Sequence, residues 1–218
     1  ISSFRKKALM RSDSALPRFI DLELKADGWI KKYVLRYELP DGTRYEYDSA
    51  SRKGPNAYRA ELEANGRGET PRADAVCVVP QTRDGRLVLI KEFRYPLNSW
   101  CIAFPAGLID PGEDPAESID RELREETGFA LRRDLDEPLE LLPQVGYSSA
   151  GFTDETIQVA FAQVEKVADA APEEAELIVP FEVAINDIPR FLSENTIPIS
   201  TRAQLILDGF ARHRDCNA

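Results

Sequence analysis

Histidine is nearly missing from this sequence, which carries one, His213, in 218 residues. The three cysteines, Cys77, Cys101 and Cys216, show neither a CxxC pair nor the spacing of a zinc site. This composition argues against catalysis by a Ser–His pair and against a metal centre built from several histidines. Scattered cysteines in odd number favour reduced thiols, and hence a cytoplasmic protein.

Long apolar runs and a basic surplus are also lacking. No stretch suits a membrane span or a signal-peptide core. The net charge of −10 disfavours general binding to nucleic acid or to an anionic membrane, because both need a basic surface. A phosphate substrate stays compatible if a metal ion supplies the positive charge. Five basic residues against one acid in residues 5–18 resemble a transit peptide, although we interpret them as a frayed basic tail.

The first part of the chain predicts a small antiparallel β unit. Strand-like segments, alternating or rich in aromatic residues, lie at 20–24, 29–38 and 43–47. Asp41-Gly42 predicts a hairpin turn, and 56–63 predicts a short helix or a loop. So small a sheet needs a packing partner, either the main domain or a second subunit. The run 65–68 is the clearest linker, so we predict domains at 1–68 and 69–218.

The second part predicts a mixed α/β domain. The apolar run 75–79 suits a strand buried on both faces. Further strands are predicted at 87–93, 156–164 and 177–183, and the segments 100–104 and 139–145 lie before and after the stretch 107–129. Helices are predicted at 188–193 and 201–213, the second with Leu205, Leu207 and Phe210 as packing residues. Strands interleaved with helices imply the α/β class.

The stretch 107–129, GLIDPGEDPAESIDRELREETGF, carries the strongest local signals. Asp114 is a good N-cap, Pro115 suits the first helical position, and Glu117 completes a capping box. Thr127-Gly128 supplies the C-terminal stop. We therefore predict a helix that begins after Asp114 and ends at Gly128.

The acids of this helix are placed unusually. Ala116, Ile119 and Leu123 form one apolar stripe, with Glu122 beside it and Glu126 at its edge. Carboxylates crowded near a buried face need a cation or a proton.

The alternative is a solvated acidic helix with ordinary i,i+4 ion pairs, which would be Glu117–Arg121, Asp120–Arg124 and Arg121–Glu125. This alternative explains Glu125 and Arg121 well and Glu126 poorly.

Gly107, Glu113 and the run 121–129 together resemble the signature box of the Nudix hydrolases at every fixed position. The resemblance implies an α/β Nudix fold, a mixed β-sheet between α-helices, with the small N-terminal β unit beside it. It also implies hydrolysis of a pyrophosphate bond. Oxygen ligands without histidine or cysteine call for a hard cation, Mg²⁺ or Mn²⁺.

The resemblance assigns roles to residues of the box. Glu122 and Glu126 are the expected metal ligands, with Glu125 close behind them and the backbone carbonyl of Ala106 joining them. Arg121 is expected to orient a glutamate. Glu113 would tie the loop to the helix, and Gly107 would let the backbone approach the metal.

The flanking sequence is similar to bacterial ADP-ribose pyrophosphatases, on the phrases 92–96 (EFRYP) and 104–110 (FPAGLID). That resemblance implies cleavage of ADP-ribose to AMP and ribose 5-phosphate, and a homodimer in which the N-terminal β units are swapped. Arg94 is expected to contact the substrate, or else to be a surface arginine at a strand end.

Two loops complete the resemblance. In the loop 147–155, Glu155 is expected to bind a ribose hydroxyl, or else to be an acid facing water, and Ala150 departs from the proline usual in ADP-ribose enzymes. In the acidic loop before 177, Glu174 is the expected general base, with Glu173 and Glu176 as alternatives.

Two other functions stay open. The substrate could be another nucleoside diphosphate sugar. The domain could also be a non-catalytic Nudix module that binds a nucleotide or a protein, although such a module has no evident need for Glu122, Glu125 and Glu126.

Overall fold

The structure is a computed structural model that describes residues 16–215, with side chains described to residue 212. The basic tail before residue 16 and Cys216 therefore lie outside the described residues. By its internal contacts the chain divides into two units: Ile1–Arg72 with Tyr147–Glu155, and Ala73–Gly146 with Thr156–Ala218. The expected boundary after residue 68 lies close to the first division. The return of 147–155 to the first unit was not foreseen.

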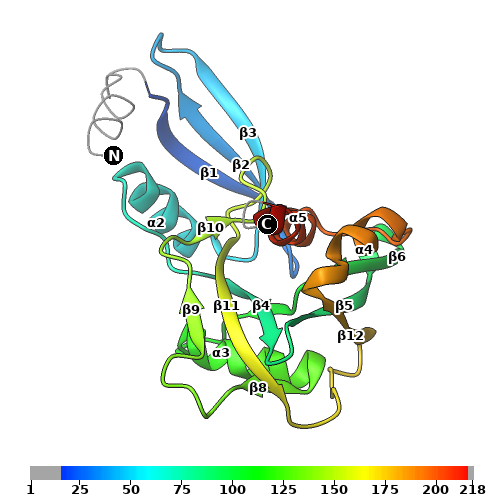
Figure 1. Cartoon of the computed structure of the whole chain (residues 1–218). Helices are drawn as coiled ribbons and strands as arrows, with labels where there is room; N and C mark the ends of the chain where they lie inside the picture. The colour runs from blue at the N-terminus through cyan, green and yellow to red at the C-terminus, as the bar shows by residue number, and fades with distance from the viewer. Residues whose placement is uncertain (1–15, 216–218) are drawn as a thin grey trace, which may run out of the picture. The chain divides into compact units, whose positions relative to one another are not determined.

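Among its described residues, 16–72 and 147–155, the first unit contains a three-stranded antiparallel sheet and one helix (Figure 1). Its strands are β1 (Arg18–Ala26), β2 (Lys31–Glu38) and β3 (Arg44–Ser51), and its helix is α2 (Pro55–Gly66). Tyr58 of α2 packs edge-on against Tyr33 of β2, with ring centroids 5.0 Å apart, in a core shared with Leu22 and Leu35. The sheet is thus covered by a helix of its own unit, a partner that the sequence did not suggest.

The second unit is built on a mixed sheet that counts nine strands within the described residues. Its central order is β10 (Gly146–Tyr147), β11 (Thr156–Lys166), β4 (Ala75–Thr82), β5 (Arg86–Arg94) and β12 (Ile178–Ala184). Strands β4 and β11 run parallel, and β5 runs antiparallel to both of its neighbours β4 and β12. Shorter strands join this path: β6 (Ser99–Ala103), β7 (Ala106–Leu108), β8 (Phe129–Leu131) and β9 (Leu139–Leu141).

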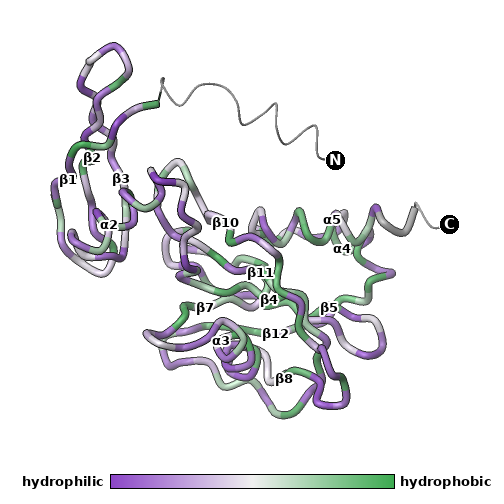
Figure 2. Tube along the Cα trace, turned by 90° about the vertical axis from the view of Figure 1, so that its left-hand side faces the viewer, coloured by the Kyte–Doolittle hydropathy of each residue, from purple (hydrophilic) through white to green (hydrophobic). Residues whose placement is uncertain are grey.

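Helices cover both faces of this sheet. Along β4, Val76 and Val78 face a core with Ile119 and Leu123 of the box helix, which begins as α3 (Pro115–Glu122). The alternate residues of β4, with Cys77 among them, face the core of α4 (Ile188–Glu194) and α5 (Thr201–Asp215). Figure 2 shows the apolar residues concentrated along β4 and β11. This layered arrangement confirms the predicted fold class.

Within the segment 139–145, only Leu139–Leu141 forms a strand. One local prediction was wrong. On α5, Leu207 is buried, but Leu205 is 67% exposed and Ile206 packs on the core in its place.

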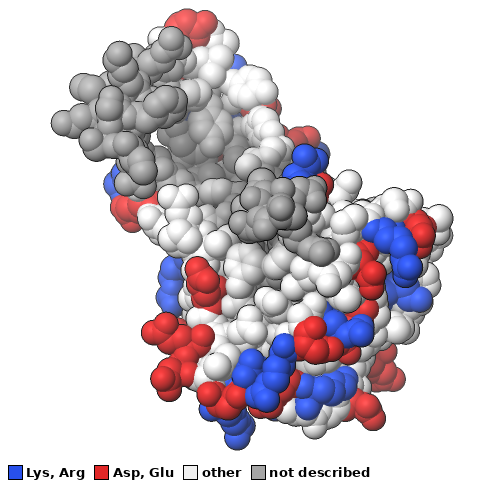
Figure 3. Space-filling view, viewed as in Figure 1, with Lys and Arg blue, Asp and Glu red and all other residues white. Residues whose placement is uncertain are grey.

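No helix among the described residues is long and apolar enough to cross a membrane. On the face of the second unit seen in Figure 3, acidic and basic side chains are interspersed.

Candidate metal centre

The box helix begins as the sequence predicts. The Asp114 side chain accepts a hydrogen bond from the Ala116 N–H at 2.9 Å, and the Glu117 side chain accepts one from the Asp114 N–H at 3.3 Å. Together with Pro115 in the first turn, these contacts form the capping box. The start of the helix is therefore fixed by residues that are close neighbours in the sequence.

The last turn of the helix is not α-helical. Residues Leu123–Thr127 form a π-helical turn, which ends at Gly128 in the left-handed conformation with φ of 72°. A π turn advances each residue by less than the 100° of an α-helix, so it changes where Glu126 points. Glu126 is 3% exposed and Glu122 is 8% exposed. Both carboxylates are therefore buried, whereas the sequence placed Glu126 at the edge of the apolar stripe.

Gly107 lies on β7 beside β4, directly under the box helix. A Cβ atom built at Gly107 would collide with the carboxylate of Glu122. The glycine is thus required by a close approach between the loop and the helix, rather than by an unusual φ angle.

Arg121 binds three of the box acids at once. Its Nε and Nη2 donate to the two carboxylate oxygens of Glu113 at 3.1 and 3.0 Å, and Nη2 also donates to the Leu108 carbonyl at 3.0 Å. Its Nη1 donates to Glu122 at 2.7 Å and to Glu125 at 3.2 Å. The ion pair with Glu117 that the solvated-helix alternative requires is not among these contacts. Arg121 is instead held by the loop, which fixes its guanidinium against Glu122 and Glu125.

Glu113 anchors this arrangement. The Arg121 guanidinium, then the Ser118 hydroxyl and the Asp110 N–H, lower the pKa of Glu113 from 4.5 to about 2. The same contacts raise the pKa of Arg121 above its usual value, with the hydrogen bonds to Glu113 as the largest cause. Both groups therefore stay charged, and the loop stays tied to the helix.

Glu126 is the most perturbed acid of the site. Burial raises its pKa from 4.5 to about 9, although the Ala106 N–H donates to its Oε2 at 3.0 Å. The charges of Glu122, Glu92 and Glu176 raise the pKa further. These carboxylates come from the box helix, from β5 and from the segment before β12, so the tertiary structure gathers them in one place.

Glu92 is a member of this cluster that the sequence did not single out. Its side chain is 14% exposed and pairs with Arg94 Nη1 at 2.8 Å. Burial raises its pKa, the charge of Arg94 lowers it, and the charge of Glu176 raises it. The one sequence signal was an acid near the end of the strand, two residues before the arginine predicted to bind substrate.

The donor chemistry of the cluster fits a hard divalent cation, since it offers carboxylate and backbone oxygens. As placed, no group of three histidine, cysteine or acidic side chains within the described residues is arranged to hold a metal ion. Two of the expected ligands, Glu122 and Glu125, are bound by Arg121 instead. Ligation by these two residues, by Glu126 and by the Ala106 carbonyl therefore stays a prediction.

The other predicted residues lie outside this cluster or at its border. Arg94 is half exposed and bound to Glu92. Glu174 is exposed in the acidic loop. In the same loop Glu176 accepts a hydrogen bond from the Glu173 N–H at 3.1 Å. The charge of Glu176 is one of the causes that raise the pKa of the buried Glu126.

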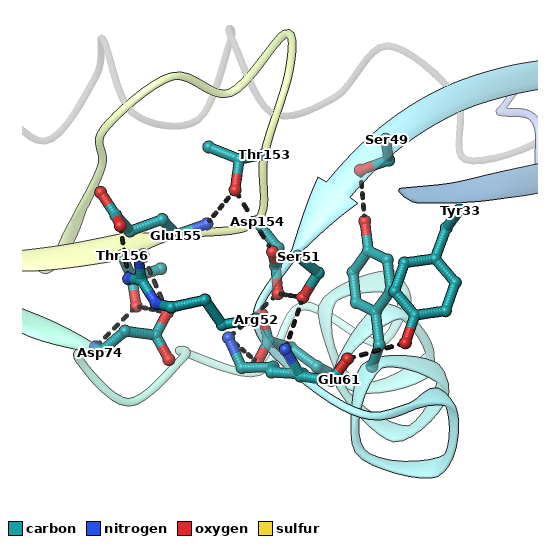
Figure 4. A network of polar contacts seen from close by, with 12 residues as sticks. Tyr33, Ser49, Ser51, Arg52, Glu61, Asp74, Thr153, Asp154, Glu155 and Thr156 are labelled. Carbon is teal, nitrogen blue, oxygen red and sulfur yellow. Dashed lines mark hydrogen bonds and ion pairs between the residues drawn. The ribbon is translucent and has the colours of Figure 1, made fainter. Parts of the chain in front are cut away.

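Glu155 belongs to the first unit, where the loop 147–155 is held by polar contacts with β3 and the residues after it (Figure 4). Glu155 pairs with Arg52. The adjacent Asp154 is buried and accepts from the Ser51 hydroxyl at 2.9 Å and from Lys53 Nζ at 3.0 Å. The side chain predicted to bind a ribose therefore has a protein partner, which the sequence did not reveal.

Comparison with known proteins places the chain in a family. The family model described as the NUDIX domain matches residues 71–199. An ADP-ribose pyrophosphatase of Bacillus subtilis is 31% identical over 127 residues, covering 56% of this chain and 64% of that protein. An ADP-ribose pyrophosphatase of Saccharomyces cerevisiae is 30% identical over 165 residues, covering 74% and 66%. A methanol dehydrogenase activator of Bacillus methanolicus is 32% identical over 125 residues, covering 56% and 64%.

The fold has a solved counterpart. The crystal structure of an ADP compounds hydrolase matches with a TM-score of 0.68 at 22% identity, over 93% of this chain and 96% of that one. The curated relatives named above are matched over less than two thirds of their own lengths. The family model, by contrast, covers more than half of this chain and includes the whole box. The chain therefore belongs to the NUDIX domain family.

Proposed function

We propose that this protein is a Mg²⁺-dependent hydrolase, active also with Mn²⁺, that cleaves ADP-ribose to AMP and ribose 5-phosphate. The observation that carries the proposal is the burial of the Glu126 carboxylate near other acids, Glu122 among them, because carboxylates gathered in a buried place call for a cation or a proton. The names of the B. subtilis and S. cerevisiae relatives support ADP-ribose as the substrate.

Four groups would hold the cation: the carboxylates of Glu122, Glu126 and Glu125, and the backbone carbonyl of Ala106. A bound divalent cation supplies charge neutralisation of the phosphates and a bound water of lowered pKa. The protein supplies the orientation. The Ala106 N–H fixes one oxygen of Glu126, and Arg121 fixes Glu122 and Glu125 from the side of the loop.

The general base would come from the acidic loop. The sequence favours Glu174, with Glu173 and Glu176 as alternatives. The charge of Glu176 raises the pKa of Glu92, Glu122 and Glu126, which supports Glu176 as the loop acid nearest to the buried cluster. A base must reach the water that attacks phosphorus, so its distance from the metal ligands decides between the three.

Substrate contacts are proposed for Arg94 and Glu155. Arg94 is half exposed at the end of β5, where its guanidinium can exchange Glu92 for a phosphate. Glu155 would have to release Arg52 to meet a ribose hydroxyl. Ala150, in the same loop, keeps another nucleoside diphosphate sugar open as the substrate.

A homodimer formed through the first unit is part of the proposal. That unit exposes the large apolar side chains of Trp29 (75%), Ile30 (52%) and Phe152 (63%), which are available for contact with a partner. Sedimentation, which compares the oligomeric state of the wild-type protein with that of Trp29→Glu, tests this contact.

We also propose a cytoplasmic location, since Cys77 and Cys101 are buried free thiols.

The experiment that tests the function is a hydrolysis screen with added Mg²⁺. ADP-ribose is compared with other nucleotide sugars, dinucleoside polyphosphates and nucleoside triphosphates. Preferential release of AMP from ADP-ribose supports the proposal, and preference for another sugar nucleotide assigns the alternative substrate. If no compound is cleaved, the non-catalytic module gains support, and the relative named as a methanol dehydrogenase activator makes protein binding the next assay.

A further inference from the structure

The acidic loop between β11 and β12 is tied at its first end to the box helix. The Val167 N–H and the Ala168 N–H donate to the Gly128 carbonyl at 3.0 and 3.1 Å. A Cβ atom built at Gly128 would collide with the Ala168 carbonyl, so the two backbones lie in close approach. Further along the loop, the Ala171 N–H donates to the Glu125 carbonyl at 2.9 Å. The loop therefore starts against the π turn that carries expected metal ligands.

The other end of the loop is tied to β5 and to the turn that follows β5. The Phe93 N–H donates to the Leu177 carbonyl at 3.0 Å, which extends the pairing of β5 with β12. Tyr95, the first residue of the short 3₁₀ helix η2 (Tyr95–Leu97), donates its hydroxyl hydrogen to the Ala175 carbonyl at 3.2 Å. The first of these ties belongs to the backbone of the sheet, whereas the second is made by a side chain and can be removed by substitution.

Between the two ends lies a compact turn that carries the three acids considered as the general base. We call residues 173–176 the acidic turn. The Glu176 N–H donates to the Glu173 carbonyl at 2.9 Å, and the Glu173 N–H donates to the Glu176 carboxylate at 3.1 Å, with Glu174 between them. These two hydrogen bonds close the turn on itself. The Tyr95 hydroxyl, which binds the carbonyl at the third position, therefore holds the three acids as one unit.

The ring of Tyr95 is placed by a row of aromatic contacts. Its centroid lies 5.4 Å from that of Phe93, with the two rings at 81°. Phe93 packs in the same edge-on manner against Trp100 of β6, with centroids 6.0 Å apart, and Lys91 Nζ lies 4.8 Å from the centroid of the Trp100 ring. Such contacts are favourable and directional. Tyr95 is 66% exposed, so these contacts, rather than burial, orient its hydroxyl toward the loop.

We infer that Tyr95 is a positioning residue, whose hydroxyl holds the acidic turn at the metal centre. The inference rests on the proposed function, since it takes the general base from this turn. The loop is tied to the π turn of the box helix at one end and, through Tyr95, to the end of the strand that carries Glu92 at the other. A base contributes only when its carboxylate is within reach of the attacking water, so a turn that leaves this place lowers the rate.

Amide hydrogen exchange at saturating Mg²⁺ tests the tie without requiring turnover. Tyr95→Phe removes the hydroxyl and keeps the ring. The amides of Glu173 and Glu176, which are bonded within the turn, should then exchange roughly 3- to 10-fold faster than in the wild type, since one hydrogen bond of ordinary strength is lost. Ser193→Ala is the matched control, because it removes another exposed hydroxyl that donates to a backbone carbonyl, that of Arg190, in the same unit. It should leave exchange at the acidic turn unchanged.

Turnover of ADP-ribose separates a positioning role from a purely structural one. Tyr95→Phe should lower kcat by roughly 3- to 10-fold and leave KM and the melting temperature unchanged. In a protein whose general base has been replaced by glutamine, the same substitution should cause no further loss, because the group that Tyr95 positions is already missing. Losses that multiply in the double variant would mean that Tyr95 acts on the substrate directly, and they overturn the inference.

Two further results contradict the inference. Exchange at the acidic turn that is equal in Tyr95→Phe and in the wild type shows that the hydroxyl does not hold the turn. Faster exchange with an unchanged kcat shows that the tie takes no part in hydrolysis. A wild type that cleaves no compound of the hydrolysis screen rejects the proposed function, and faster exchange in Tyr95→Phe then still upholds Tyr95 as the residue that positions the turn.

Discussion

The carboxylate of Glu122 lies against the α-carbon of Gly107, in the space that any side chain at position 107 would need. Arg121 Nη1 holds the same carboxylate from another side at 2.7 Å. Glu122 is therefore confined between the backbone of Gly107, which has no side chain, and the fixed guanidinium of Arg121. Its placement depends on both neighbours, and each can be changed separately.

Gly107→Ala should displace the Glu122 carboxylate and weaken Mg²⁺ binding by roughly 10- to 100-fold, as loss of a ligand-positioning contact does. Magnesium affinity is measured by calorimetry, and the turnover of ADP-ribose is expected to decrease together with it. Gly146→Ala is the matched control, because a Cβ atom there meets nothing within 4 Å. Equal Mg²⁺ affinity in the two variants would show that Glu122 takes no part in metal binding.

Glu126→Gln should reduce turnover by about 100-fold or more, because it removes a charged oxygen ligand while keeping the side-chain shape. It should leave the melting temperature of metal-free protein unchanged or raise it, since a buried carboxylate costs stability. Glu117→Gln is the control on the same helix, where a glutamine still serves the capping box. Undiminished turnover in Glu126→Gln would remove the argument for this metal site.

The lowered pKa of Glu113 predicts that the stability of the folded protein depends on pH. Its pKa is lowered from 4.5 to about 2 in the folded protein, so its contribution is full above the unfolded pKa and is lost as the pH falls from 4.5 toward 2. The difference in unfolding free energy between wild type and Glu113→Gln should therefore be constant near neutral pH and shrink over that acid range. Chemical denaturation at stepped pH measures it. The exposed Glu140→Gln serves as a control, and a difference that stays constant down to pH 2 would contradict the assignment.

The pair Arg52–Glu155 distinguishes a structural from a substrate role for Glu155. If the pair serves to hold the loop, Arg52→Met and Glu155→Gln should destabilise the protein similarly, and the double variant should show a coupling energy of about 1 kcal/mol. Neither single variant should then change KM for ADP-ribose by itself. A KM raised by Glu155→Gln alone, with no coupling, would instead support contact with the ribose.

The three loop acids can be ranked by kinetics. Replacing the base by glutamine should lower kcat by roughly 10²- to 10⁴-fold with little change in KM, because proton abstraction is made only in the transition state. The effect of the Glu176 charge on the buried acids predicts the largest loss for Glu176→Gln, whereas the sequence favours Glu174→Gln. Glu173→Gln, on the same exposed loop, completes the comparison. Similar small losses in all three would place the base outside this loop.

The sequence by itself determined the features that depend on near neighbours along the chain. The cap formed by Asp114 and Glu117, the stop at Gly128 and the apolar strand β4 follow from local hydrogen bonds and periodicity. With the box residues, these features were enough to predict the fold class and the helix that carries the acids.

Only the tertiary structure decided the features that join distant residues. The carboxylate of Glu126, at the π turn, accepts a hydrogen bond from the N–H of Ala106 on β7, twenty residues away along the chain. Glu92 enters the cluster from β5, and Arg52 reaches Glu155 across 103 residues. A pattern in the sequence shows which face of an element is apolar. It does not show which charged group from elsewhere will meet that face, because desolvation and charge pairing are set by the packed neighbours.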